Sequence, residues 1–414
     1  MECQEKISRR TFLKTTAFAA AGMTVLPSLF REASGASDFL KPSIPESSLT
    51  GFAGVVMATS TLNGKPRVDL ISLRNGRILA TFEDIFVSHA VVPVEALNRF
   101  FVHGRDTVTR KGVIWGLKIN LETEEWLVIY RKQLDGGLVL HWQPNDDYSL
   151  IQYNTIEDRA LHVLDTKTLE LQTYQAGGTH SNMAFFNDDG WLVATDHLRN
   201  GTKLHLIDRN TNKVLAETKV GDWGHGVTVN NKTGRAFVWA TDGVHVVSLA
   251  RSNLGAHLGV IKPPEHEQRS WFCWTPQGAR YSHDQTWNPG DRFSPWLTVI
   301  DMENDALERI NTDSEQPGTL QISPDGKIGV SGSHSSNNVC LFDIENNRFL
   351  GTVGVGNRNS GFFDRDASFS RDRNIAFVSN PNDKTISAID IQLMKTIHHI
   401  DLPAKPRWMK VLTL

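Results

Sequence analysis

Cysteine is scarce in this sequence, with three residues among 414, which is too few for a disulfide-rich scaffold. Neither sign of charge dominates, since 43 Lys and Arg stand against 46 Asp and Glu for a net charge of −3, and this excludes a strongly basic nucleic-acid binder. No run of 18 or more apolar residues follows the first thirty positions, so no helix is expected to span a bilayer there. With 40% hydrophobic and 21% charged residues, the composition is that of an ordinary globular protein.

The motifs of several common chemistries are also missing. The chain has no Gly-x-x-x-x-Gly-Lys-Ser/Thr phosphate loop, no Gly-x-Ser-x-Gly turn, no His-Glu-x-x-His pair and no EF-hand loop. Neither Cys273 nor Cys340 belongs to a Cys-x-x-Cys-His motif, so covalent c-type heme is excluded. These two cysteines could pair in an oxidising compartment or remain as buried thiols.

The N-terminus carries the pattern of an export signal. The segment Ser8 to Lys14, SRRTFLK, is similar to the bacterial twin-arginine signal. A mildly apolar stretch from Thr15 to Leu26 follows, and small residues precede a cleavage point expected after Ala36. We therefore predict export to the periplasm through the Tat translocon, with a cleaved signal, a linker and one domain at residues 1–36, 37–50 and 51–414.

Export would leave the charge of the chain nearly balanced. Removing residues 1–36 takes away five Lys/Arg and three Asp/Glu, which leaves 38 basic and 43 acidic residues and a net charge of −5. Such a surface gives no electrostatic reason to bind nucleic acid or anionic lipid. No stable membrane span is expected after cleavage; the alternatives are that the segment is an N-terminal anchor or that the arginine pair arose by chance.

An internal repeat predicts the fold. The segments 328–355 and 375–402 each read as a short strand, a polar turn, an alternating strand that ends in an acid, a further turn and a final strand. An acid, Asn or Ser recurs at this place because its side chain hydrogen-bonds the backbone two residues on and starts a tight turn. The positions are Asp69, Asn120, Asp165, Asp208, Ser248, Asp301, Asp343 and Asp390. Their mean spacing of about 46 residues matches the blade of a β-propeller.

The innermost strands indicate how the ring closes. Seven are expected, near His89, Val139, Ser181, Gly226, Trp271, Thr319 and Ala367. An eighth is expected at Pro406 to Val411, while residues 51–83 read as a blade that lacks its inner strand. Pairing the two ends would remove the exposed sheet edges. We therefore predict an all-β chain with a single propeller of eight blades, closed by the C-terminal strand; seven blades is the alternative if the Asn120 or Ser248 copy is an insertion.

These blades resemble the YVTN-type periplasmic propeller repeats over essentially all of residues 51–414. That family includes stand-alone propellers and the d1-heme domain of cytochrome cd1 nitrite reductase, and eight blades would favour the cd1-like branch. The chain has no c-heme domain, so the resemblance does not imply a complete nitrite reductase. Because propellers host binding, scaffolding and catalysis on one frame, the resemblance implies the fold more strongly than the function.

Chemistry is expected at the axial funnel of such a propeller, where the loops before the inner strands converge. Three of these loops carry histidine, the commonest side-chain ligand of Zn, Cu and Fe, at His89, His180 and His225. Arginines near other inner strands could hold carboxylates, including heme propionates, by paired hydrogen bonds: Arg269, Arg365 and Arg407. Two aromatic side chains, Trp271 and Trp408, could stack on a flat ligand.

A structural role stays open for each of these residues, since the repeat alone can place histidines at one position and tryptophans commonly fill the core between blades. Three functions therefore remain. The first is a propeller that binds Fe, Cu or a non-covalent heme for electron transfer or cofactor assembly, with a periplasmic redox partner. The second is a non-catalytic binding or scaffold propeller for a protein or small molecule. The third is a metal-dependent hydrolase of the lactonase type, in which a divalent cation activates water.

Overall fold

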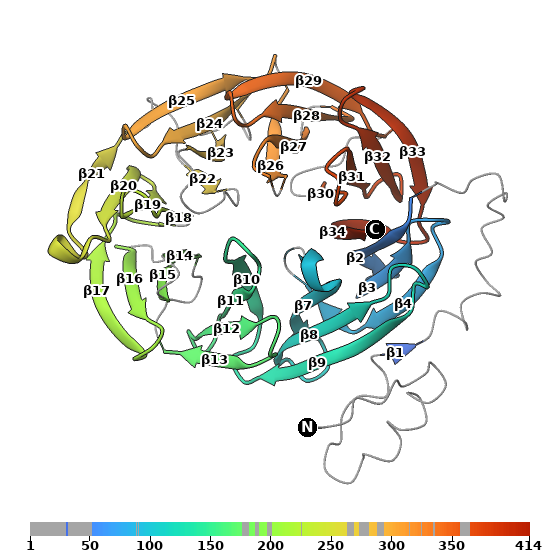
Figure 1. Ribbon diagram of the computed structural model, residues 1–414, viewed down its shortest axis with the longest axis horizontal. Coiled ribbons are helices and arrows are strands. Elements are labelled where there is room, and N and C mark those ends of the chain that lie inside the picture. The colour runs from blue at the N-terminus through green and yellow to red at the C-terminus, as the bar shows by residue number, and fades with distance from the viewer. Residues whose placement is uncertain are drawn as a thin grey trace, which may run out of the picture.

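Eight antiparallel sheets form a ring around a central axis in the computed structural model (Figure 1). The structure describes the two-residue strand β1 and residues 52–414, apart from 88, 90, 176–181, 187–189, 197–200, 225, 263–268, 273–280, 288–293, 314, 324, 334–335 and 357–364. For residues 30–31, 269–272, 282–287 and 319 it describes the backbone alone. The predicted all-β architecture is confirmed.

Six of the sheets have four strands each, which follow one another in the chain from the axis outward. The first three of these sheets are β10 (Val139–Pro144), β11 (Leu150–Thr155), β12 (Leu161–Asp165) and β13 (Leu171–Tyr174); β14 (Met183–Phe186), β15 (Trp191–Thr195), β16 (Lys203–Asp208) and β17 (Lys213–Lys219); and β18 (Val227–Asn230), β19 (Arg235–Ala240), β20 (Gly243–Ser248) and β21 (His257–Ile261). The next three are β22 (Arg269–Phe272), β23 (Tyr281–Trp287), β24 (Trp296–Asp301) and β25 (Ala306–Asn311); β26 (Pro317–Ile322), β27 (Ile328–Ser333), β28 (Asn338–Asp343) and β29 (Arg348–Gly354); and β30 (Ala367–Phe369), β31 (Ile375–Asn380), β32 (Thr385–Asp390) and β33 (Lys395–Asp401).

The two ends of the chain meet in a seventh sheet. Its order is β34 (Lys405–Thr413), β2 (Gly54–Leu62), β3 (Lys65–Ser72), β4 (Ile78–Glu83) and β1 (Phe30–Arg31). The C-terminal β34 is innermost and pairs antiparallel with β2 from Thr413 opposite Gly54 to Lys405 opposite Thr61. This pairing occupies the backbone edge that each strand would otherwise expose.

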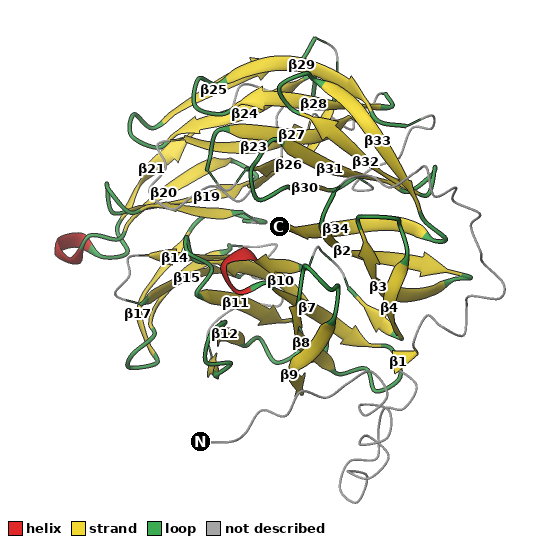
Figure 2. Cartoon of the chain, turned by 45° about the vertical axis from the view of Figure 1, so that its right-hand side comes forward, coloured by secondary structure: helices red, strands yellow, loops and turns green. Residues whose placement is uncertain are grey.

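The eighth sheet has an interrupted inner strand. Its order is β5 (Ile85–Phe86), β7 (Arg99–Asp106), β8 (Gly112–Ile119) and β9 (Trp126–Leu134), and β6 (Val92–Val94) also pairs with β7. The short strands β5 and β6 thus share one partner, with His89 in the gap between them. The helical elements of the described residues are two short 3-10 turns, η3 (Glu95–Leu97) and η4 (Arg251–Asn253) (Figure 2). No helix in these parts of the chain is long and apolar enough to cross a membrane.

Facing sheets pack through their apolar sides. Val339 of β28 belongs to one buried cluster with Val378 of β31, and Val193 of β15 to another with Val229 of β18. Strand residues alternate between the two faces, so each sheet supplies apolar side chains to both of its neighbours. The core is therefore a series of wedges between the sheets.

Turn residues after the third strand lie as predicted in most repeats, and one assignment was wrong. The carboxylate of Asp165 accepts the backbone N–H groups of Lys167 and Thr168 at 2.8 and 2.7 Å. In the first repeat, however, this role belongs to Ser72, whose hydroxyl accepts the N–H of Arg74 at 3.1 Å. Asp69 instead lies inside β3 and is 2% exposed.

A buried polar residue recurs three positions before this turn residue, at Asp69, His162, His205, His245 and Ser387. The His162 ring lies 3.0 Å from the hydroxyls of both Thr155 and Thr173, on the strands either side. His205 lies 3.3 Å from Asp196 and 3.2 Å from Glu217. These side chains link the second, third and fourth strands of a sheet, so the three histidines among them are structural.

Replacing Asp165 by alanine tests the turn assignment. We expect D165A to lower the free energy of unfolding by about 1 kcal/mol, because two backbone N–H groups lose their acceptor. Chemical denaturation measures the change. Glu170→Ala is the control, since Glu170 is exposed in the same hairpin. Equal stabilities for the two variants would refute the assigned role.

Candidate functional site

Three rings come together from three neighbouring sheets of the ring. His89 lies in the gap between β5 and β6, and its ring stacks on that of His141 from β10, with centroids 4.8 Å apart and planes 24° apart. The ring of Trp408 from β34 lies 5.7 Å from that of His89. The sheet of β5 and β6, which holds His89, lies between the sheet of β34 and the sheet of β10. The fold therefore brings together residues that are far apart in sequence. We call His89, His141 and Trp408 the histidine site.

His141 was not predicted from the sequence. Its side chain is nearly buried, at 8% exposure, and its backbone N–H donates to Asn154 Oδ1 at 2.7 Å. The pairing of β10 with β11 shifts register between Val139 and Trp142, at a bulge that contains His141. A bulge breaks the two-residue alternation of a strand, so the direction of this side chain cannot be read from the spacing alone. The sequence could have indicated His141 only by its position near the start of an expected inner strand.

A third histidine lies fully buried behind the site. His103 on β7 has 0% exposure, and its ring centroid is 5.3 Å from that of Tyr153. Among the described residues, the two ring nitrogens of His103 have no hydrogen-bond partner. The hydroxyl of Tyr153 has none either. Burial, together with the nearby His89, lowers the pKa of His103 from 6.5 to about 3. His103 is therefore neutral at physiological pH and adds no positive charge beside His89.

The other predicted ligands are only partly placed. His180 and His225 lie outside the described residues, and Arg269 and Trp271 lie on β22, of which the backbone alone is described. Trp408 is 6% exposed, and its backbone N–H donates to Thr59 Oγ1 at 3.0 Å. Of the eight residues proposed from the sequence, His89 and Trp408 are thus brought together.

The two remaining arginines differ in their surroundings. Arg365 is 6% exposed and its guanidinium donates to the carbonyls of Ser336 and Asn338 at 3.3 and 2.9 Å, which connects it to the neighbouring sheet. Burial lowers the pKa of this guanidinium, and the acids nearby oppose the shift. Arg407 is exposed, with its guanidinium carbon 5.9 Å from the centre of the Trp408 ring. Arg407 is the arginine of this pair that a ligand can reach from solvent.

The donor set decides which ligands fit the histidine site. Neutral imidazole suits Fe, Cu and Zn, whereas Ca and Mg prefer oxygen. Within the described ranges no group of three or more His, Cys, Asp or Glu side chains is close enough to hold a metal ion. His89 and His141 can thus supply two imidazoles.

Cys340 takes no part in this site. It is a free thiol with 0% exposure, and burial raises its pKa well above the usual range, with the nearby Glu315 adding to the shift. Such a thiol is chemically inert. Its possible partner from the sequence, Cys273, lies outside the described residues.

Comparison with known proteins identifies the fold. No protein-family model and no curated protein matches the chain. Similar solved structures include apo AztD from Citrobacter koseri, at a TM-score of 0.64 and 14% identity over 87% of this chain and 98% of that one. The dihydro-heme d1 dehydrogenase NirN, in complex with DHE, has a TM-score of 0.59 and 15% identity over 89% and 77%. Kuenenia stuttgartiensis hydrazine synthase has a TM-score of 0.52 and 12% identity over 74% and 96%. These likenesses establish the propeller fold of the chain.

Proposed function

We propose that this protein is an exported β-propeller that binds a metal ion or a flat, non-covalent redox cofactor at the histidine site. The observation that carries the proposal is the meeting of His89, His141 and Trp408 from three neighbouring sheets, with the His89 ring centroid 4.8 Å from that of His141 and 5.7 Å from that of Trp408. The complex of NirN with DHE adds support, because it is a structure of similar fold that holds a ligand.

Each residue has a distinct part in this proposal. His89 and His141 offer imidazole nitrogens, and His180 and His225, which precede β14 and β18 in the sequence, are the further ligands proposed. The indole of Trp408 gives a flat ligand a face on which to stack. The exposed guanidinium of Arg407 can pair with carboxylates of the ligand. Iron or copper held there would supply one-electron redox chemistry.

Export belongs to the same proposal. The twin-arginine pattern at Ser8 to Lys14 and the cleavage expected after Ala36 would deliver the propeller to the periplasm. Transport of a folded chain would let the ligand be inserted before export. The ligand should therefore be sought in protein that was exported by its own signal.

The proposed ligand should be present in the purified protein. We expect periplasmic protein to carry Fe or Cu at about one per chain, or a visible absorption band, and to lose at least tenfold in occupancy in H89A and H141A. Elemental analysis and an absorption spectrum on one sample measure both. His398→Ala is the matched control, because His398 lies on the outer strand β33, and it should keep full occupancy.

Three results would contradict this assignment. A folded, colourless and metal-free periplasmic protein would favour the non-catalytic binding propeller. Retained Ca or Mg without colour would favour a metal-dependent hydrolase, and Zn that stays bound in H89A and H141A would do the same. Equal losses in H398A and H89A would place the ligand away from the histidine site.

A further inference from the structure

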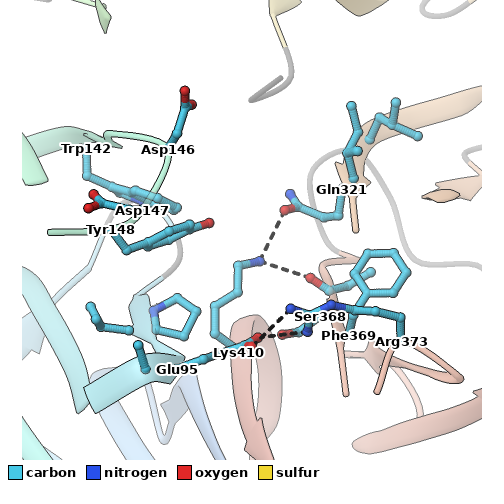
Figure 3. A pocket seen from close by; sticks show the side chains of 16 residues that line it. Glu95, Trp142, Asp146, Asp147, Tyr148, Gln321, Ser368, Phe369, Arg373 and Lys410 are labelled. Atoms are coloured by element: carbon cyan, nitrogen blue, oxygen red, sulfur yellow. Dashed lines mark hydrogen bonds and ion pairs between the residues drawn. The ribbon is translucent and has the colours of Figure 1, made fainter. Parts of the chain in front are cut away.

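A cavity of about 280 Å³ lies further along the same inner strands. Its walls come from β6, β10, β26, β30 and β34, together with η3 and the turns after β10 and β30 (Figure 3). Lys410 follows Trp408 by two residues on β34, and Trp142 follows His141 directly on β10, so the cavity is next to the histidine site but has its own lining. We call it the Lys410 cavity.

The cations of this lining are already engaged. The Lys410 ammonium donates to both carboxylate oxygens of Asp366 at 2.9 Å and to the carbonyl of Ala367 at 2.9 Å. It also contacts Gln321 Oε1 at 3.3 Å. Arg373 pairs with Glu95 through two contacts of 3.0 and 3.1 Å. No cation of the described lining is left to bind an anion, which argues against an anionic ligand.

Aromatic rings and acids make up much of the remaining surface. Trp142 and Tyr148 lie on one side of the Lys410 ammonium and Phe369 on the other (Figure 3). Asp147 is exposed at the same cavity, and its carboxylate accepts a backbone N–H from Ser149 at 2.9 Å. Aromatic faces attract cations, and the attraction increases where water is excluded. The exposed carboxylate of Asp147 favours the same sign of charge.

We propose that the Lys410 cavity binds a small organic cation, of the alkylammonium class, with its charged group against Trp142 and Tyr148. The size of the cavity restricts the ligand to a few carbon atoms around the charge. This inference is independent of the function proposed for the histidine site, because it uses other side chains and other chemistry.

Choline and its neutral isostere 3,3-dimethylbutan-1-ol test the proposal, since they differ in charge and hardly in shape. Titration calorimetry on the full periplasmic protein should show one choline site per chain and at least tenfold weaker binding of the alcohol. We expect Trp142→Leu to weaken choline binding about tenfold through loss of the ring face. Asp147→Asn, which keeps the oxygen acceptor, should weaken it about threefold and reduce its dependence on salt.

Control variants distinguish binding in the Lys410 cavity from binding at the histidine site. Asp401→Asn should leave choline binding unchanged, because Asp401 is an exposed acid at the end of the outer strand β33. H89A with H141A should stay within twofold of the wild type, whatever becomes of the metal or cofactor. If the Trp142→Leu variant folds poorly, choline binding is measured on Trp142→Phe, which keeps an aromatic ring and should bind choline more weakly than the wild type. The proposal fails if the alcohol binds as well as choline, or if neither choline nor tetramethylammonium binds.

Discussion

Replacing Lys410 by methionine should lower the free energy of unfolding by about 3–5 kcal/mol. Removing one partner of a buried ion pair leaves the other charge without compensation in a poorly solvated place. The Lys410 side chain is 8% exposed, and that of Asp366 is 0% exposed. The carboxylate would keep only the backbone N–H groups of Ala367 and Met409, each at 2.9 Å.

The loss in K410M should depend on pH in a defined direction. Burial raises the pKa of Asp366, and Lys410 opposes that shift. Without the ammonium, the folded-state pKa of Asp366 moves further above its unfolded value, so the penalty is greatest when the carboxyl must ionise. K410M should therefore recover stability relative to the wild type as the pH falls, because the proton neutralises the buried group.

A double variant identifies the cause of this loss. K410M with Asp366→Asn removes both charges and keeps a side chain of similar shape, so it should regain most of the stability. Lys262→Met is the control, since the Lys262 side chain is 66% exposed and surface ion pairs contribute little. Denaturant unfolding measures all four proteins. A change below 1 kcal/mol in K410M would show that the pair does not hold the fold.

This pair is important because of where it lies. Lys410 is on the C-terminal strand that closes the seventh sheet, and Asp366 immediately precedes β30 of the adjacent sheet. The backbone pairing of β34 with β2 joins the two ends within one sheet. The ion pair adds a connection between sheets at the same place, so its loss should loosen the closure of the ring first.

The fold was predictable because its signals are local. An Asx or Ser turn needs only its own side chain and the next few backbone groups, so the turn residue recurs wherever a third strand ends. The inner strands follow at regular distances, and β10, β18, β22 and β30 lie at the expected places. The turn assignment of Asp69 was wrong because a short polar side chain can also form hydrogen bonds between the strands of a sheet. It bonds there with Ser60, Arg67 and Thr81.

The site was harder to predict because it depends on direction as well as position. His89 was found from its place before an inner strand, but the gap between β5 and β6 sets its orientation. His141 was missed because a bulge turns it. Arg365 shared the sequence signal of Arg407, yet one guanidinium connects two sheets and the other faces solvent. Which of two such side chains reaches a ligand is determined by packing between sheets that are far apart in the chain.

Acid should destabilise the protein partly through His103, the fully buried histidine behind the histidine site. Its pKa is about 3 in the folded chain and about 6.5 when the chain unfolds. Between these values the unfolded state binds a proton that the folded state does not, so stability falls as the pH falls below about 6.5. Each pH unit contributes about 1.4 kcal/mol, so His103 accounts for a loss of about 2 kcal/mol between pH 7.5 and pH 5.

His103→Leu should remove this share of the acid sensitivity. At pH 7.5 the variant should be at least as stable as the wild type, because no hydrogen bond of His103 to a described residue is lost and a buried polar group without a partner costs free energy. Unfolding free energies at pH 5 and pH 7.5 give the comparison. Val108→Leu, at a position that is 63% exposed and carries no titratable group, should leave the difference between the two pH values as in the wild type. An unchanged difference in H103L would mean that the His103 ring is solvated or bonded in solution and takes its proton before the protein unfolds.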